Sequence, residues 1–177
     1  MTESDKERFK RIHAIRKKAK IVTYSAMYGV GKAKLARSTG MSEFEAKKLL
    51  DAFWKINWAV VEISKSADVK TVDGSMWIKN PVSGFWHSLR FEKDAWSTIN
   101  QSTGVYCFDN WLAFYLSRRP NIIGQFHDES INRIKKGEEA IHEETLKWAI
   151  QKVNDKLKLN IDLDVDVQFG NRYSEIH

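Results

Sequence analysis

The sequence has little of what marks secreted or membrane proteins. Its 177 residues include one cysteine, Cys107, so no disulfide can form within the chain, which fits a reducing compartment. It has no run of 18 apolar residues, so no transmembrane helix is predicted. The first five residues lack the basic and then apolar order of a signal peptide. These absences favour a cytoplasmic protein that makes no membrane contact.

The amino-acid composition is typical of a globular protein, but the charged residues are unevenly distributed along the chain. Hydrophobic residues make up 42% of the chain and charged residues 29%, as in globular proteins. The net charge is +6, but residues 1–50 carry 13 Lys and Arg against 5 Asp and Glu, whereas residues 51–177 carry 16 against 18. A concentrated basic segment predicts a polyanionic partner, although a basic face can also be simply solvated.

A row of four side chains lies in this basic segment. Arg16, Lys20, Tyr24 and Tyr28 recur every fourth residue, and Gly29 follows. On an α-helix such a row drifts by about 40° per step, so two cations and two rings share one face. An apolar stripe lies roughly 150° away, formed by Ile12, Ile15, Ala19, Val22 and Ala26. We expect one face to pack and the other to meet a ligand that is anionic at one end and flat at the other, such as a nucleoside triphosphate.

The first part of the chain is predicted to be helical. A helix is expected from about Arg11 to Tyr28, after a charged and frayed lead-in over residues 1–10, and Gly29 suits its end. A short helix is expected over residues 31–37. Ser42 and Glu45 form a capping box for another helix. Its apolar face is expected to pack in a core or against another helix, and comprises Ala46, Leu49, Phe53, Ile56, Val60 and Ile63.

The rest of the chain mixes strands and helices. Turn signals between residues 69 and 91 predict an irregular loop with short strands. A helix is expected over 94–117, followed by strands over 122–126 and 130–134, joined tightly by His127, Asp128 and Glu129. A helix is expected from Glu138 to about Lys158. Residues 161–169 alternate between apolar and polar, which predicts a half-buried strand.

Three segments, in order, resemble motifs of family A DNA polymerases, the DNA polymerase I family, in its phage form. The pattern R-x-x-x-K-x-x-x-Y-x-x-x-Y-G, from Arg16 to Gly29, is similar to the fingers-helix motif. Residues 126–129, Phe-His-Asp-Glu, resemble the H-D-E palm motif at a hairpin turn. Between them, residues 101–104 resemble the Q-x-x-G helix segment. The resemblance covers the chain from about Arg11 to its end.

The resemblance implies roles for individual residues in a two-metal nucleotidyl transfer. Asp128 would bind Mg²⁺, with Glu129 as the neighbouring acid. Arg16 and Lys20 would bind the triphosphate, and Lys20 could protonate the pyrophosphate that leaves. Tyr24 would pack against the sugar, and its hydroxyl implies weak discrimination against dideoxynucleotides. The DNA contacts implied are His127 near the primer strand, Gln101 in the minor groove, Tyr28 near the template base, and Gly29 beside it.

The sequence also departs from the family. Ser97 stands where the family often has Asn, and the segment from Gly74 to Ala95 matches poorly. The family places a first palm motif, with the other metal-binding aspartate, some 40 to 50 residues before the Arg of the fingers helix. No such motif precedes Arg16 here. We therefore expect a split polymerase, in which a second polypeptide supplies the thumb, the first palm motif and the missing aspartate.

The fold expected is α+β, with helical fingers followed by the C-terminal half of a palm that carries an antiparallel hairpin. Residues 1–67 form the fingers, 68–93 an irregular region of loops and short strands, and 94–177 the palm half with a C-terminal strand. The function expected is DNA-directed DNA synthesis from dNTPs on primer–template DNA, with Mg²⁺ as cofactor, in the host cytoplasm if a phage encodes the chain.

Two alternatives remain open at this point. A fragment of a single-subunit RNA polymerase has a similar helix and palm motif, but those enzymes usually carry a non-tyrosine residue at the position of Tyr24 and no acid after the aspartate. A non-catalytic remnant would bind the DNA backbone through the basic half, with steep salt dependence. Intact Lys20, Tyr28 and Asp128 argue against decay of the site.

Overall fold

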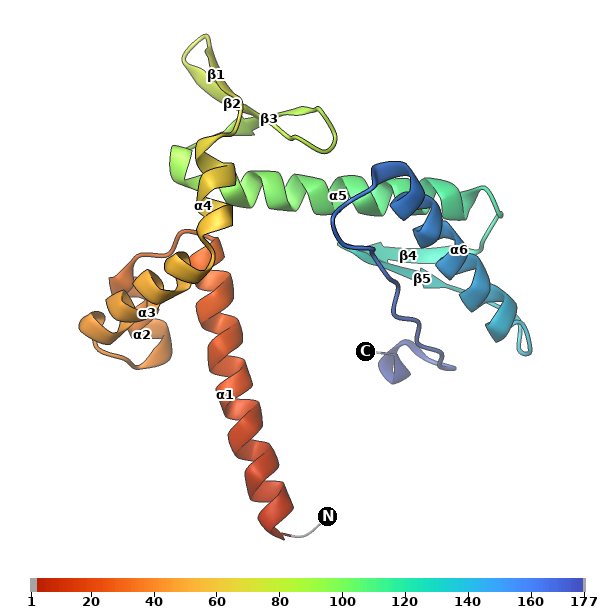
Figure 1. Ribbon diagram of the computed structural model, residues 1–177. Coiled ribbons are helices and arrows are strands. Elements are labelled where there is room, and N and C mark those ends of the chain that lie inside the picture. The colour runs from red at the N-terminus through yellow and green to blue at the C-terminus, as the bar shows by residue number, and fades with distance from the viewer. Residues whose placement is uncertain (1–2, 177) are drawn as a thin grey trace. The chain divides into compact units, whose positions relative to one another are not determined.

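The protein contains helices and two small antiparallel sheets, so the predicted α+β class is confirmed. The computed structural model shown in Figure 1 describes residues 3–176. The chain divides into two compact units, Met1–Asn100 and Gln101–His177. No helix among the described residues is long and apolar enough to cross a membrane.

The first helix, α1 (Glu3–Met27), begins eight residues earlier than predicted. The expectation of a frayed lead-in is therefore wrong, except for residues 1 and 2, which lie outside the described residues. The reason is composition, since Glu, Lys and Arg are good helix formers and dominate this segment. Glu7 and Arg11 also stand four residues apart, the spacing that favours an opposite-charge pair on a helix.

The end of α1 is fixed by a Schellman motif around Gly29, as the glycine predicted. The Val30 N–H donates to the Ser25 carbonyl at 2.9 Å, and the Gly29 N–H donates to the Ala26 carbonyl at 2.9 Å. Gly29 has a φ of +67°, which side chains other than glycine adopt with strain.

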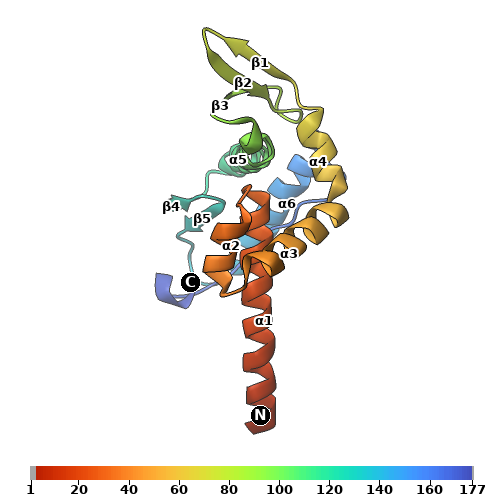
Figure 2. The ribbon, with the colours of Figure 1, turned by 90° about the vertical axis from the view of Figure 1, so that its left-hand side faces the viewer.

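Two helices fold back against the C-terminal end of α1, as Figures 1 and 2 show. They are α2 (Lys32–Thr39) and α3 (Glu43–Ile56). The predicted capping box starts α3: the Glu45 N–H donates to Ser42 Oγ at 3.2 Å, and the Ser42 N–H donates to the Glu45 carboxylate at 2.9 Å. These bonds from Ser42 hold the pKa of Glu45 below its usual value. The core of the three helices comprises Val22, Leu35, Ala36 and Ala46.

The helix predicted to continue through Ile63 is broken at Asn57, and α4 (Trp58–Lys65) follows. The Asn57 side-chain amide donates to the Phe53 carbonyl at 2.8 Å, a local bond of the kind that competes with regular helix. The continuous packed face that the spacing predicted is therefore wrong in part. Ile56 is 78% exposed and Ile63 43% exposed.

The segment predicted as loop with short strands is a three-stranded antiparallel sheet. Its strands are β1 (Val69–Val72), β2 (Ser75–Lys79) and β3 (Trp86–Leu89). Asp73 and Gly74 join β1 to β2 with φ values of +50° and +75°, as a type I′ turn requires. On the inner face, Ile78 and Leu89 are buried against the residues where the next helix begins, Ala95 and Ile99.

The hydrophobic core of the second unit lies between two helices. A short 3₁₀ turn, η1 (Glu92–Asp94), leads into α5 (Ala95–Leu116), which crosses from the first unit into the second. The strands β4 (Ile122–Phe126) and β5 (Glu129–Asn132) form a hairpin, and α6 (Glu139–Leu157) follows. These helices match the predicted ones closely. The core residues are Trp111, Tyr115, Leu146, Ala149 and Val153.

The strand predicted for residues 161–169 is absent, although its alternation is present in the burial. Leu163, Val165 and Val167 are half-buried against the α5–α6 core, whereas the aspartates between them are exposed. The Leu163 backbone bonds to a side chain in place of a neighbouring strand: Asn154 accepts from its N–H and donates to its carbonyl, both at 2.9 Å. A final 3₁₀ turn, η2, spans Tyr173–Glu175.

Leu35→Ala is expected to destabilise the three-helix core by about 2–5 kcal/mol, because Leu35 is fully buried and the core cannot collapse around the missing side chain. Ile56→Ala in the same unit removes an exposed side chain and should change the free energy of unfolding by about 0.5 kcal/mol or less. Urea unfolding followed by circular dichroism measures both. Equal losses of stability in the two variants would contradict the helical packing described here.

Candidate functional site

The predicted basic and aromatic row is exposed along α1, and residues 5–20 of the helix are exposed on every side. Arg16, Lys20, Tyr24 and Tyr28 are all exposed, the two tyrosines by 53% and 52%. The Lys20 ammonium lies 5.5 Å from the centre of the Tyr24 ring. Tyr28 directly follows the helix, and its N–H continues the pattern by donating to the Tyr24 carbonyl at 3.0 Å. The row therefore presents two cations and two rings to solvent.

The opposite stripe of α1 packs only at Val22 and Ala26, near the C-terminal end of the helix. Val22 is 8% exposed and Ala26 is fully buried, as predicted. Ile12 and Ile15 are 54% and 59% exposed, and Ala19 is exposed as well, so the expectation that the whole stripe packs is wrong for these three residues. The reason is that α2 and α3 cover α1 only near its end.

The palm-like motif lies at the turn of the β4–β5 hairpin. Phe126 pairs with Glu129, so the turn consists of two residues, His127 and Asp128. The predicted three-residue connection is therefore one residue too long, because Glu129 already belongs to β5. His127 has a φ of +49°, and both turn residues are exposed, whereas Glu129 is half-buried. The Asp128 carboxylate is thus presented at the tip of a hairpin, as predicted.

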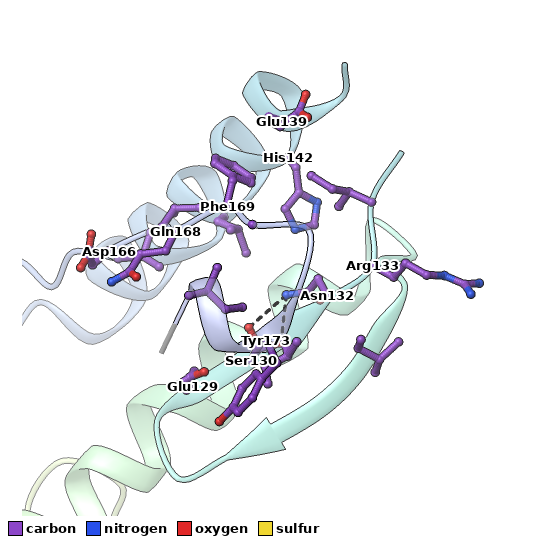
Figure 3. Close-up of a pocket in the computed structure, with 18 of the residues that line it drawn as sticks. Glu129, Ser130, Asn132, Arg133, Glu139, His142, Asp166, Gln168, Phe169 and Tyr173 are labelled. Carbon is purple, nitrogen blue, oxygen red and sulfur yellow. Dashed lines mark hydrogen bonds between the residues drawn. The ribbon is translucent and has the colours of Figure 1, made fainter. Parts of the chain in front are cut away.

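The hairpin borders a cavity of about 1100 Å³ within the second unit. Figure 3 shows side chains reaching it from three elements: Glu129 and Asn132 from β5, His142 from α6, and Asp166 and Tyr173 from the C-terminal segment. Further carboxylates on its lining are Asp128, Glu139 and Asp164, and the cations on its lining are Arg133, Lys136 and Arg172. The cavity therefore has charges of both signs.

A hydrogen bond joins α5 to α6 at the side of this cavity. The Tyr115 hydroxyl and His142 Nε2 lie 3.0 Å apart, and Tyr115 is fully buried. Burial raises the pKa of Tyr115 to about 12 and lowers the pKa of His142, because burial disfavours the charged forms of both groups. At neutral pH both side chains are therefore uncharged.

The remaining predicted site residue, Gln101, is exposed on α5, so the Q-x-x-G segment is helical as expected. The predicted site residues fall in both units, since Arg16 to Gly29 belong to the first unit and Gln101 and the hairpin to the second. Within residues 3–176, no group of three or more His, Cys, Asp and Glu side chains is placed to hold a metal ion.

The sequence pattern did not predict the cluster of lysine and tryptophan residues on the outer face of the β1–β3 sheet. The Lys70 ammonium lies 3.8 Å from the centre of the Trp86 ring. The signal was present in the sequence, because Trp77 and Lys79 stand two residues apart and so share one face of a strand. Strand pairing was needed to bring Trp86 and Lys70 to the same face.

Comparisons with known proteins leave the family of the chain open. No family model matches the sequence, and no curated protein matches it either.

Stability of the second unit should fall as the pH drops, and His142 should account for part of the fall. Because the pKa of His142 is lower in the folded chain than in the unfolded one, the unfolded state binds a proton first. The loss of stability due to His142 is absent well above pH 6.5 and grows as the pH falls through 6.5 towards the lower folded pKa. Urea unfolding between about pH 8 and pH 5 measures it. His142→Gln should weaken the pH dependence, and an identical dependence in both proteins would refute the assignment.

Proposed function

We propose that this chain is the C-terminal catalytic subunit of a split family A DNA-directed DNA polymerase. The observation that carries the proposal is the exposed row Arg16, Lys20, Tyr24 and Tyr28, which ends at Gly29. The motif resemblance requires these side chains to reach a ligand, and a row turned into the core would have excluded it. The exposed hairpin turn with Asp128 is consistent with the same assignment.

In the proposed reaction, the primer 3′-hydroxyl oxygen attacks the α-phosphorus of the incoming dNTP, and the bond to the β-phosphate breaks. The hydroxyl gives its proton to a water molecule, and pyrophosphate leaves with the electron pair of the broken bond. Arg16 and Lys20 bind the triphosphate and stabilise the charge that builds up on the leaving group. Lys20 donates a proton to the departing pyrophosphate. The Lys20 ammonium beside the Tyr24 ring is held on the side of the helix where the sugar is proposed to lie.

The tyrosines and the turn position the substrates. Tyr24 packs against the sugar of the nucleotide, and Tyr28, with Gly29, lies against the template base and the nascent pair. His127 contacts the primer strand, and Gln101 contacts the minor groove near the primer end. Half of each tyrosine surface is solvent-exposed, which leaves area for such contacts.

The carboxylates of the hairpin are the type of ligand that Mg²⁺ prefers, since this ion binds oxygen atoms and is often held by one or two carboxylates. Asp128 would hold the ion from the exposed turn, with Glu129 as the neighbouring acid. An ion held by these carboxylates would neutralise phosphate charge and activate the attacking hydroxyl. Asp128 is proposed as one ligand of a pair, and the proposed source of the other aspartate is a second polypeptide.

Exposed apolar side chains on this chain support the proposal of such a partner. The β4–β5 hairpin has only two strands, an arrangement that is marginal in isolation, and Ile123 and Phe126 on β4 are 64% and 53% exposed. Ile12 and Ile15 leave a second apolar surface on α1. A partner that carries the thumb and the first half of the palm would cover surfaces of this kind.

Asp128→Asn is expected to lower nucleotide incorporation by about 10³-fold or more, roughly 4 kcal/mol in the barrier, with little change in DNA binding. The assay is primer extension with Mg²⁺ and dNTPs, on the chain alone and on the chain copurified with whatever stays bound. Activity is expected only in the copurified sample. Asp109→Asn, an exposed aspartate on α5, is the matched control and should keep full activity. Full activity of Asp128→Asn, or inactivity of the copurified wild type, would contradict the assignment.

Tyr24→Phe is expected to increase discrimination against dideoxynucleotides by about 10- to 100-fold. The tyrosine hydroxyl can replace the missing sugar hydroxyl, and a hydrogen bond to a charged group contributes about 1.5–3 kcal/mol. The measurement is the ratio of kcat/KM for dTTP and dideoxy-TTP in the active complex. Tyr28→Phe should leave this ratio unchanged. A ratio that responds to Tyr28 and not to Tyr24 would overturn the assignment of the sugar contact.

A further inference from the structure

The β1–β3 sheet has two chemically different faces, and the strand register defines them. Ile78 pairs with Val69 and His87, and this face carries the buried Ile78 and Leu89. Residues on the opposite face alternate with these. Lys70 pairs with Trp77, and Lys79 pairs with Trp86, so all four side chains share the outer face. We call these four residues, Lys70, Trp77, Lys79 and Trp86, the outer platform.

The outer platform combines flat rings with positive charge. The Trp86 ring has the Lys70 ammonium 3.8 Å from its centre and the Lys79 ammonium 6.0 Å away. Both lysines are exposed, and both tryptophans are half-buried. Core packing does not account for these lysines and rings on the outer face, because the core contacts of the sheet are made by its inner face.

The strands themselves, with the sequences VKTV, SMWIK and WHSL, contain no acidic residue, and the nearest aspartates are Asp68 before β1 and Asp73 in the turn between β1 and β2. Basic and aromatic character also continues directly after β3. Phe91 is 50% exposed, with Arg90 Cζ and Lys93 Nζ at 5.5 and 5.6 Å from its ring centre. A ligand of this surface should therefore be anionic and should present flat apolar groups.

We infer that the outer platform binds single-stranded DNA. A base stacks on the Trp86 or Trp77 ring, and the ammonium of Lys70 moves from the ring to the phosphate of the same nucleotide. Stacking on aromatic side chains combined with cations along the backbone is how proteins bind single strands without sequence preference. A duplex satisfies only the cations, because its bases are already stacked and paired. Binding needs neither dNTP nor Mg²⁺, so the inference does not rest on the proposed polymerase activity.

The test measures binding of the full chain to a fluorescein-labelled 20-mer of deoxythymidine by anisotropy, without Mg²⁺ or dNTP. Trp86→Ala is expected to weaken binding about tenfold, the scale of one stacked base. Trp58→Ala is the matched control, because Trp58 is 65% exposed on α4 and lies outside the platform. An equal effect of both changes, or no effect of either, would overturn the inference.

A second pair of variants keeps the test informative if Trp86→Ala disturbs the sheet. Lys70→Gln with Lys79→Gln leaves the sheet core untouched and should lower the slope of log affinity against log salt by about 1.4, that is, about 0.7 for each phosphate that a lysine no longer neutralises. Lys48→Gln with Lys55→Gln removes the same charge from exposed positions of α3 and should leave the slope as in the wild type. Equal slopes in the two double variants would refute the platform.

Two further measurements separate this inference from general attraction to DNA and from polymerase activity. A 20-base-pair duplex should bind more weakly than the single strand, and its affinity should not respond to Trp86→Ala. A duplex that binds as tightly and is weakened by the same variant would contradict stacking. Asp128→Asn should bind the single strand like the wild type, so the proposed catalysis and this binding can fail separately.

Discussion

The packing of Val22 and Ala26 at the C-terminal end of α1 determines which side chains near that end of the helix face solvent. Val22 and Ala26 are held in the core that Leu35 and Ala46 complete, and this packing fixes the rotation of α1 about its own axis. Once that stripe is inside, Tyr24 and Tyr28 face solvent, whereas Arg16 and Lys20 lie in a part of α1 that is exposed on every side. A few apolar side chains at the end of α1 thus orient the two aromatic groups of the row, which is why the small core matters more than its size suggests.

The same logic places the carboxylate of the hairpin. Ile122 packs against the α5–α6 core at the start of β4, and a bulge at Ile123 shifts the register before the regular ladder begins at Gly124. The ladder ends with the pair Phe126 and Glu129. Anchor, bulge and ladder together determine that Asp128 lies in the turn.

Local signals predicted most of this fold. Some errors have local causes, such as the bond from the Asn57 side chain to the Phe53 carbonyl, and others come from contacts more distant in the sequence. The capping box at Ser42 and the glycine after α1 act within a few residues, so the sequence alone located both helix boundaries. The alternation over residues 161–169 correctly predicted that Leu163, Val165 and Val167 are half-buried, but Ile161 and Phe169, at its two ends, are exposed. It could not reveal that Asn154, on another element, would bond to the backbone of Leu163 in place of a strand. For the candidate site, the sequence indicated which side chains are exposed, but strand pairing was required to bring Trp86 beside Lys70.

The backbone at His127 limits how this hairpin can change over evolution. A left-handed φ of +49° is one that Gly, Asn and Asp adopt readily, and one that β-branched residues strongly disfavour. In the proposed function, the position must satisfy this backbone requirement while it keeps an imidazole next to the Asp128 carboxylate. Replacement by Gly or Asn preserves the turn but removes the imidazole. Replacement by Val or Ile removes the imidazole and also disfavours the backbone conformation of the turn. Substitutions should therefore accumulate more slowly at His127 than at the exposed Gln125 nearby, which carries only the strand requirement.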